Sequence, residues 1–257
     1  DDFFARTLPH FVELTAELGA ARVRSLVEQQ RFFDTHWLVT EGLIDIDRFS
    51  AMFGIFGLAE CVNLLMAYEG NDRGGAARYG HDADANALAV RVVEQVAELV
   101  AARPMPYCEG GDGRCYLHSQ SGIDLDDAVT AGTRIPVGDE PPLLDHIATC
   151  APHHHLFTSG VSDIFHVDET ATRNPEALVD IIRGAFDSGM RDFTFNLDGN
   201  EFVRITGYLV RKSDLAAIAD DAVVRHASDH LAAGSENAYH LTQRAVKRIG
   251  CNERAPR

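Results

Sequence analysis

Helical periodicity dominates the N-terminal part of the chain. Apolar residues recur at helical spacing near the start, which predicts a helix over residues 10–33. A second helix is expected to begin near Asp47 and to lie deep in the core, because it has almost no polar face. A third is expected to start at a capping Asp84 and to end before Pro104. This part of the chain is therefore predicted to be mainly helical.

The helical period disappears between about residues 104 and 170. Glycine, proline, cysteine and histidine are dense there, and Cys115–His118 is a short strand-like piece. Long irregular segments in compact domains are usually functional or disordered. Aromatic residues, valine and isoleucine persist through this segment, so we expect functional loops.

Strand and helix signals alternate in the C-terminal third. Asn174-Pro175 opens a predicted helix, since proline is favoured at the first helical position. The alternation of apolar and polar residues in Met190–Leu197 predicts a strand, which leads through a turn at Asp198–Asn200 into a further apolar segment.

That apolar segment, Phe202–Leu209, is a strand-forming run interrupted by Gly207. A lone glycine in such surroundings indicates a bulge or a close approach of the backbone. Two helices, capped by Ser213 and Ser235, are predicted to follow.

Composition and charge exclude several classes of protein. The chain has 257 residues and is 46% apolar, which suits a substantial core. It contains no run of 18 apolar residues, so no membrane span is expected. A net charge of −16, spread along the sequence, argues against a nucleic-acid partner. The five cysteines are scattered without a Cys-x-x-Cys pair, which favours reduced thiols in a cytoplasmic protein.

The residues around Gly207 carry a specific resemblance. Arg204–Tyr208 reads Arg-Ile-Thr-Gly-Tyr and resembles the Arg-Val-(Ser/Thr/Ala)-Gly-Tyr motif of glycyl radical enzymes, in which the glycine stores a radical. Loss of a hydrogen atom from Cα leaves an electron shared by the flanking amide nitrogen and carbonyl, which requires a locally flat backbone. A Cβ would clash in that form, and glycine has none. The resemblance implies that Gly207 holds the radical and that Arg204, Thr206 and Tyr208 support its loop.

Further segments extend the resemblance over nearly all of the chain. Phe53–Glu60 is similar to the Gly-Ile-x-Gly-Leu helix of pyruvate formate-lyase and anaerobic ribonucleotide reductase. Tyr79–Asp82 resembles a helix entry of the lyase branch, and Phe193–Asn196 stands where the family places the strand before the radical loop. The sequences of His118–Asp124 and Ala131–Pro136 most resemble those of the uncharacterised YjjI branch of glycyl radical enzymes.

The fold that this resemblance implies is α/β, namely the C-terminal half of a ten-stranded α/β barrel surrounded by helices. Residues 1–192 would supply the half-barrel and its active-site loops, and residues 193–257 the glycyl radical domain. In the family, a cysteine thiol gives its hydrogen atom to the glycyl radical, and the resulting thiyl radical attacks a C–H or C–C bond of the substrate.

The resemblance also implies partners and conditions. A separate radical S-adenosylmethionine enzyme with an iron–sulfur cluster would remove one hydrogen atom from Gly207. The mature protein would then be an anaerobic, oxygen-sensitive cytoplasmic homodimer that holds no metal and acts on a small organic molecule. Lyase and acyltransferase-like reactions stay open. Ribonucleotide reduction is disfavoured, because the four-cysteine zinc site that accompanies it is missing.

A thiyl cysteine is not evident in the sequence. At the spacing of the family, counting back from Gly54 reaches the start of the chain, and Cys61 lies in an apolar helix typical of a structural thiol. Cys108 and Cys115 flank a glycine-rich predicted surface loop. We therefore interpret the chain as the C-terminal piece of a longer enzyme, with the N-terminal half as its partner. Alone, half a barrel would expose strand edges and be poorly soluble or oligomeric.

The densest set of potential metal ligands is Cys150–His155. In a strand, the first and third histidines would share a face, and His166 or Cys150 would complete a metal site. Alternatively these histidines line a substrate pocket. The candidate pocket residues are His118, His153, His155, Ser159 and Asp163.

Two other functions compete with catalysis by a glycyl radical. The first is a radical-donor subunit or fragment, which supplies a glycine to a damaged partner chain and has no catalysis of its own. The second is a metal-dependent enzyme centred on the His153–His155 cluster.

Overall fold

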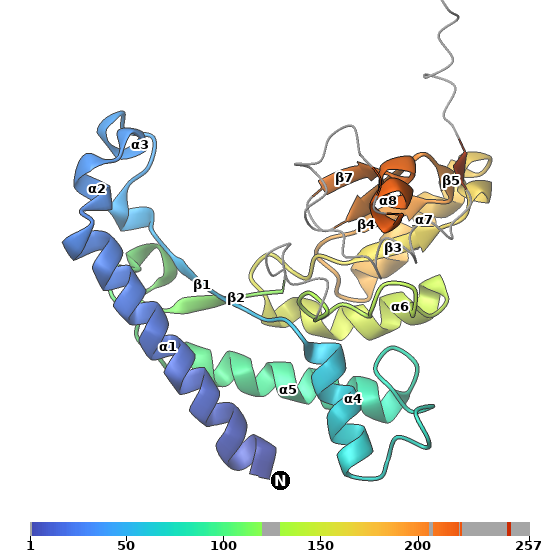
Figure 1. Cartoon of the computed structure of the whole chain (residues 1–257), viewed down its shortest axis with the longest axis horizontal. Helices are drawn as coiled ribbons and strands as arrows, with labels where there is room; N and C mark the ends of the chain where they lie inside the picture. The colour runs from blue at the N-terminus through green and yellow to red at the C-terminus, as the bar shows by residue number, and fades with distance from the viewer. Residues whose placement is uncertain (1, 120–128, 206–207, 221, 223–245, 248–257) are drawn as a thin grey trace, which may run out of the picture. The chain divides into compact units, whose positions relative to one another are not determined.

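The computed structural model describes residues 2–119, 129–205, 208–220, 222 and 246–247. The chain forms two compact units, each assembled from separate stretches (Figure 1). The first unit comprises Asp1–Gly54, Val90–His118 and Leu156–Thr158, and the second comprises Ile55–Ala89, Ser119–His155 and Ser159–Arg257.

The first unit combines a long helix with a small parallel sheet. Its elements are η1 (Phe3–Thr7), α1 (Leu8–Arg24), η2 (Ser25–Gln29), α2 (Phe32–Thr35), α3 (Trp37–Thr40), η3 (Ile46–Arg48), β1 (Ala51–Gly54), η4 (Glu109–Gly111) and β2 (Cys115–His118). The helix predicted over residues 10–33 is confirmed as α1 with η2, and it ends where Arg31 adopts a φ of 52°. Strands β1 and β2 are parallel, with Ala51 opposite Cys115. The strand expected at Cys115–His118 is thereby confirmed.

The helix predicted from Asp47 is wrong in its first half. Residues 46–54 form η3 and β1, and α4 (Leu58–Tyr68) begins only after Gly57. Gly57 has a φ of 77°, which a right-handed helix does not accommodate, and a Cβ there would lie 2.7 Å from Val129 Cγ1. The side chains of β1 are not uniformly buried either, since Met52 is 65% exposed.

The core of the first unit is apolar, and the loop that follows its buried Cys108 lies at the surface as predicted. Buried Val23, Met105 and Cys108 pack together. In the loop, Glu109, Gly110 and Asp112 are exposed, while the backbone packs so closely that a Cβ at Gly110 would clash with Arg48 O. This close backbone contact attaches η4 to the core.

The second unit contains most of the remaining elements (Figure 1). They are α4, α6 (Leu143–Cys150), η6 (Ala151–Leu156), β3 (Ile164–Val167), η7 (Glu169–Thr172), α7 (Pro175–Asp187), β4 (Thr194–Leu197), β5 (Gly199–Asn200), β6 (Phe202–Ile205), β7 (Tyr208–Arg211), α8 (Lys212–Ala219) and β8 (Val246–Lys247). Helix α5 (Ala83–Ala101) contributes to both units.

A β–α–β arrangement organises the second unit. Strands β3 and β4 are parallel, with Ile164 opposite Thr194, and α7 connects them along the chain. Strands β6 and β7 pair in the antiparallel sense, while β5 and β8 are parallel. The described residues thus form four two-stranded sheets. The α/β class is confirmed, but a ten-stranded barrel is not observed, because closing one needs more strands than these residues supply.

Several local predictions for the second unit hold. The Asn174 side chain accepts a hydrogen bond from Ala177 N at 3.4 Å and begins α7 as expected. Strand β4 lies within the predicted Met190–Leu197 segment, and α8 starts one residue before Ser213. The helix predicted at Ser235 lies outside the described residues.

Two helix starts differ from expectation. Asp82, rather than Asp84, begins α5, because its Oδ1 accepts hydrogen bonds from Asp84 N at 3.0 Å and Ala85 N at 3.2 Å. Helix α6 was not predicted, since it is short and lies in the segment where the helical period disappears. No helix in the described part of the chain is both long and apolar enough to cross a membrane.

At Gly132 the backbone approaches another segment more closely than at the other described glycines of the second unit. Its φ is 57°, and a Cβ there would lie 1.1 Å from Ser119 O. Only glycine fits this position. The contact brings Ser119 against the segment that contains Thr133 and Arg134.

Candidate active site

The interior of the second unit contains an unusual number of polar side chains. Such groups are seldom fully buried unless hydrogen bonds or opposite charges compensate them. The polar cluster, as we call it, consists of Tyr79, Thr133, Arg134, His146, Cys150, His153, His154 and Asp163, all of them buried.

An ion pair links helix α6 to the start of β3. His146 Nε2 lies 3.1 Å from Asp163 Oδ2, and the two side chains are 2% and 6% exposed. Burial alone would raise the pKa of Asp163, but the charge and hydrogen bond of His146 and the charge of Arg134 outweigh it and lower that pKa to about 2. Burial alone would lower the pKa of His146, yet the Asp163 carboxylate raises it. The Asp163 carboxylate is therefore ionised at neutral pH, and it favours the protonated form of His146.

Tyr79 joins two further members of the polar cluster. Its hydroxyl donates a hydrogen bond to Thr133 O at 2.7 Å and lies 3.2 Å from His153 Nε2. Burial, followed by the charges of Cys150 and Asp163, raises the pKa of Tyr79 well above its usual value, so the hydroxyl keeps its proton. Burial, followed by the charge of His154, lowers the pKa of His153 to about 4, so this imidazole is neutral at pH 7.

His154 and Cys150 form the other side of the cluster. His154 Nδ1 accepts hydrogen bonds from Arg191 N at 2.9 Å and Val161 N at 3.3 Å. Its Nε2 lies 3.6 Å from Cys150 Sγ. Burial, aided by the negative charge of Asp163, raises the pKa of Cys150 well above its usual value. The thiol therefore stays protonated and is not a thiolate nucleophile at neutral pH.

Only part of the predicted pocket comes together in this cluster. Asp163 and His153 belong to it. His155 and Ser159 are exposed, and His118 lies half-buried at the end of β2 in the first unit.

The prediction that His153 and His155 lie on one face of a strand is wrong. Residues 151–156 form a 3-10 helix, in which residues three apart, not two, lie on one side. His166, the suggested further ligand, instead has Nδ1 2.9 Å from Asp198 Oδ1. Throughout the described ranges, no three His, Cys, Asp or Glu side chains are grouped so as to hold a metal ion.

Sequence reasoning missed four members of the polar cluster, Tyr79, Thr133, Arg134 and His146. The first three lie in segments that only carried the family resemblance, and His146 lies in the unpredicted helix α6. The spacing of four residues between His146 and Cys150, which places both on one side of a helix, was the available signal.

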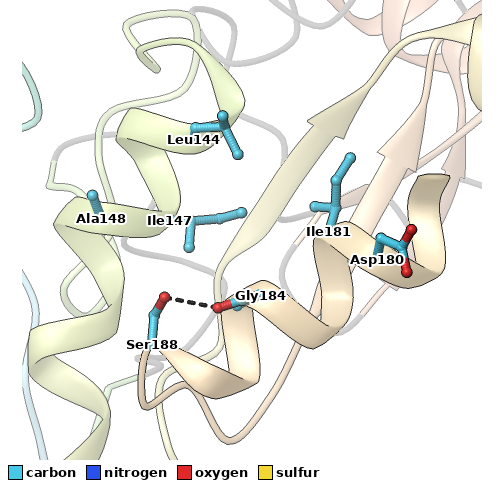
Figure 2. A pocket seen from close by; sticks show the side chains of 8 residues that line it. Leu144, Ile147, Ala148, Asp180, Ile181, Gly184 and Ser188 are labelled. Carbon is cyan, nitrogen blue, oxygen red and sulfur yellow. Dashed lines mark hydrogen bonds between the residues drawn. The ribbon is translucent and has the colours of Figure 1, made fainter.

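Among the described residues of the second unit, two surface pockets stand out. The first, of about 470 Å³, is an apolar groove between α6 and α7, into which Leu144, Ile147 and Ile181 project (Figure 2). At the end of α7, Ser188 Oγ donates a hydrogen bond to Gly184 O at 2.7 Å (Figure 2). The second pocket, of about 630 Å³, lies at the carboxyl ends of β3 and β4 and is lined by the His166–Asp198 pair.

The radical motif lies at the connection between β6 and β7. The register of these strands places Ile205 opposite Tyr208, the two residues that flank Thr206 and Gly207 in the sequence. Thr206 and Gly207 lie outside the described residues, while Arg204 and Tyr208 are described as backbone of the two strands.

Comparison with known families decides the relationship of the chain. The model of a family described as "Glycyl radical enzyme YjjI-like" matches residues 1–247. The chain belongs to this family. The match includes the whole motif around Gly207, so the resemblance inferred from the sequence is confirmed.

Two curated relatives are longer than this chain. The "Uncharacterized protein YjjI" of Escherichia coli K12 is 51% identical over 215 residues, which cover 84% of this chain and 40% of that protein. An "Uncharacterized protein" of Haemophilus influenzae is 31% identical over 250 residues, which cover 96% of this chain and 48% of that protein. The chain thus spans less than half the length of either relative. No solved structure matches it.

Proposed function

We propose that this chain is the C-terminal portion of a glycyl radical enzyme that stores its radical on Gly207. The observation that carries the proposal is the family match across the Arg204–Tyr208 motif. The paired strands on either side of that motif support it, because they fix the backbone next to the glycine. In this proposal, residues 193–257 act as the radical domain, and Arg204, Thr206 and Tyr208 hold the radical loop.

The proposed reaction moves single hydrogen atoms. In activation, the hydrogen of Gly207 Cα passes to a carbon radical generated by a separate iron–sulfur S-adenosylmethionine enzyme. In turnover, a cysteine thiol outside this chain gives its hydrogen atom to Gly207 Cα, which moves the odd electron to sulfur. That sulfur then starts the cleavage or rearrangement of a small organic substrate by a lyase or acyltransferase-like reaction in the absence of oxygen.

The remainder of a longer enzyme is the proposed structural partner. Each sheet in the described residues has two strands, so every strand has one edge without a neighbour in its sheet. Strands supplied by an N-terminal half would cover these edges and complete a ten-stranded barrel. A cytoplasmic homodimer of such chains is the proposed assembly.

We place the substrate next to the polar cluster. His153 and Asp163 are the predicted pocket residues that lie there, whereas the other candidates, His118, His155 and Ser159, lie outside the cluster. A fully buried set of charged groups is typical of sites whose chemistry must exclude water.

Electron paramagnetic resonance tests the proposal. The chain within its full-length polypeptide is incubated without oxygen with the activating enzyme, reductant and S-adenosylmethionine. We expect a doublet near the free-electron g value, which disappears in Gly207→Ala. Gly184→Ala is the matched control, because a Cβ at this glycine meets no atom within 4 Å, and it should keep the doublet.

Exposure to air provides a second readout of the same proposal. Oxygen should cut the activated chain at Gly207 and release a C-terminal piece of about 50 residues. A silent spectrum together with an uncut chain would refute the proposal.

A further inference from the structure

Several atoms in the polar cluster lack hydrogen-bond partners. In the part of the chain that the structure describes, four buried side-chain atoms are in this state: Glu60 Oε2, Thr133 Oγ1, Arg134 Nη2 and His153 Nδ1. Three of the four belong to the polar cluster. Buried polar atoms without partners destabilise a protein, and native structures contain few of them. A group of them indicates that something completes the site.

The hydrogen bonds of Tyr79 fix the tautomer of His153. The hydroxyl has one proton, and Thr133 O, 2.7 Å away, can only accept it. His153 Nε2, 3.2 Å from the same oxygen, must therefore be the donor in the second hydrogen bond. A neutral imidazole carries one N–H group, so the buried Nδ1 of His153 has a lone pair and accepts hydrogen bonds.

Arg134, in contrast to His153, has a hydrogen-bond donor that lacks an acceptor. Its Nε donates a hydrogen bond to Ser162 O at 3.0 Å, which fixes the guanidinium, while Nη2 has no partner. The residue is 6% exposed, and no carboxylate within the described ranges forms an ion pair with it. A guanidinium is always charged, and a buried one is normally paired with an anion.

Hydrogen bonds place both residues in one part of the cluster: Arg134 follows Thr133, whose O shares the Tyr79 hydroxyl with His153 Nε2, and Arg134 Nε binds Ser162 O, next to Asp163. The charge of Arg134 acts on Asp163, and the charge of Asp163 acts on His153. Asp163 itself is already engaged by His146 and by Ile164 N. A cationic donor and a neutral acceptor are thus left unsatisfied around one buried centre.

We infer that Arg134 and His153 bind a small hydroxy-carboxylate. Arg134 Nη2 donates to its carboxylate, and His153 Nδ1 accepts a hydrogen bond from its hydroxyl. Thr133 Oγ1 can donate to the ligand or accept from it. The identification of this ligand as the substrate rests on the proposed function, whereas the binding itself does not.

The binding test uses the chain within its full-length polypeptide, without the radical and in air. L-Lactate and 3-hydroxypropanoate are titrated calorimetrically against propanoate, which has a carboxylate and no hydroxyl. We expect saturable binding of at least one hydroxy acid, about tenfold or more tighter than that of propanoate, because propanoate leaves His153 Nδ1 without a partner. If the hydroxy acids bind no better than propanoate, the unpaired atoms hold ordered water only and the inference is wrong.

Variants separate the two contacts. His153→Gln keeps a donor for the Tyr79 hydroxyl and should remove the preference for the hydroxyl group. Arg134→Lys should weaken hydroxy acids and propanoate alike by about tenfold, because the planar donor is lost. Arg78→Lys, at the surface pair with Asp139, is the control and should change neither affinity. An unchanged hydroxyl preference in His153→Gln would refute the assigned role of His153.

Nitrogen NMR of histidine-labelled chain gives a readout that a purely structural role would not change. The His153 signals should show an unprotonated Nδ1 in the free chain, and hydroxy-acid binding should shift that resonance. A protonated Nδ1 would overturn the inference. These measurements need no radical. The binding inference can therefore be refuted while the paramagnetic signal of Gly207 persists, and the signal can be absent while binding is observed.

Discussion

The cores of the two units differ in the chemistry that fills them. In the first unit, Val23, Met105 and Cys108 pack as an apolar cluster. In the second, the His146–Asp163 ion pair and its polar neighbours are buried beside apolar residues such as Val62 and Phe165. An apolar core tolerates changes that preserve its volume, whereas a buried polar network depends on every partner. The first core is therefore suited to stabilising the fold. The polar side chains of the second are suited to binding and orienting a ligand.

The largest difference is expected from removing one member of the buried ion pair. Asp163→Ala leaves a buried His146 without its carboxylate, which should cost about 3–5 kcal/mol of unfolding free energy. Asp139→Ala is the control, since Asp139 and its partner Arg78 have side chains that are 38% and 36% exposed, and it should cost less than about 1 kcal/mol. Hydrogen exchange over β3 and β4, read by mass spectrometry, measures both. Equal losses would contradict the contrast between the two pairs.

Acid should weaken the second core before the first. The pKa of His153 is lowered to about 4, so its contribution is complete above pH 6.5 and is lost as the pH falls toward 4, by roughly 3 kcal/mol. Asp163, with a pKa of about 2, loses its contribution below pH 3.8. The raised pKa of His146 acts oppositely, and its contribution is lost as the pH rises through that raised value.

The buried thiols of the first core behave differently. Burial raises the pKa of Cys108 above the usual value of a thiol, so this group does not titrate in the acid range. An NMR titration of His153, combined with urea unfolding between pH 4 and 8, measures the difference. A normal pKa at His153 would remove the predicted sensitivity to acid.

The apolar core should respond to volume alone. Met105→Ala is expected to cost about 3 kcal/mol and Met105→Leu less than about 1.5 kcal/mol, because only the first leaves a large cavity. Hydrogen exchange over α1, followed in urea by mass spectrometry, reports on unfolding of this unit. Each of the two losses should have the same value at pH 5 and at pH 8. A clear pH dependence of either loss would contradict the difference between the two cores.

The smallest effect is expected from Tyr79→Phe. This change removes the hydroxyl between Thr133 O and His153 Nε2 and should cost about 1–2 kcal/mol. It also frees His153 to change its tautomer, which histidine NMR detects. A fixed tautomer in this variant would mean that another group controls the position of the proton.

Local signals in the sequence predicted the elements that depend on neighbouring residues. Asn174-Pro175 identified the start of α7, and the alternation in Met190–Leu197 identified β4. The predicted helix at Asp47 failed because its apolar run carries Gly57, whose positive φ and contact with Val129 separate β1 from α4. A tertiary contact there overrides the local pattern.

The polar cluster could not be predicted in the same way. Its hydrogen bonds join Tyr79 to residues 54 and 74 positions later, and no local period encodes such pairs. Asp163 was predicted as a pocket residue because its loop is rich in polar side chains. Arg134 was overlooked, because arginine side chains usually lie in solvent. The radical motif, in contrast, is contiguous, and it identified the family without any structure.

The contact between Gly132 and Ser119 has a consequence for natural variation. Any side chain at position 132 would need the space that Ser119 O occupies, so a single-base change from glycine would displace the backbone that leads to Thr133 and Arg134. Natural variants of this protein should therefore keep glycine at this position.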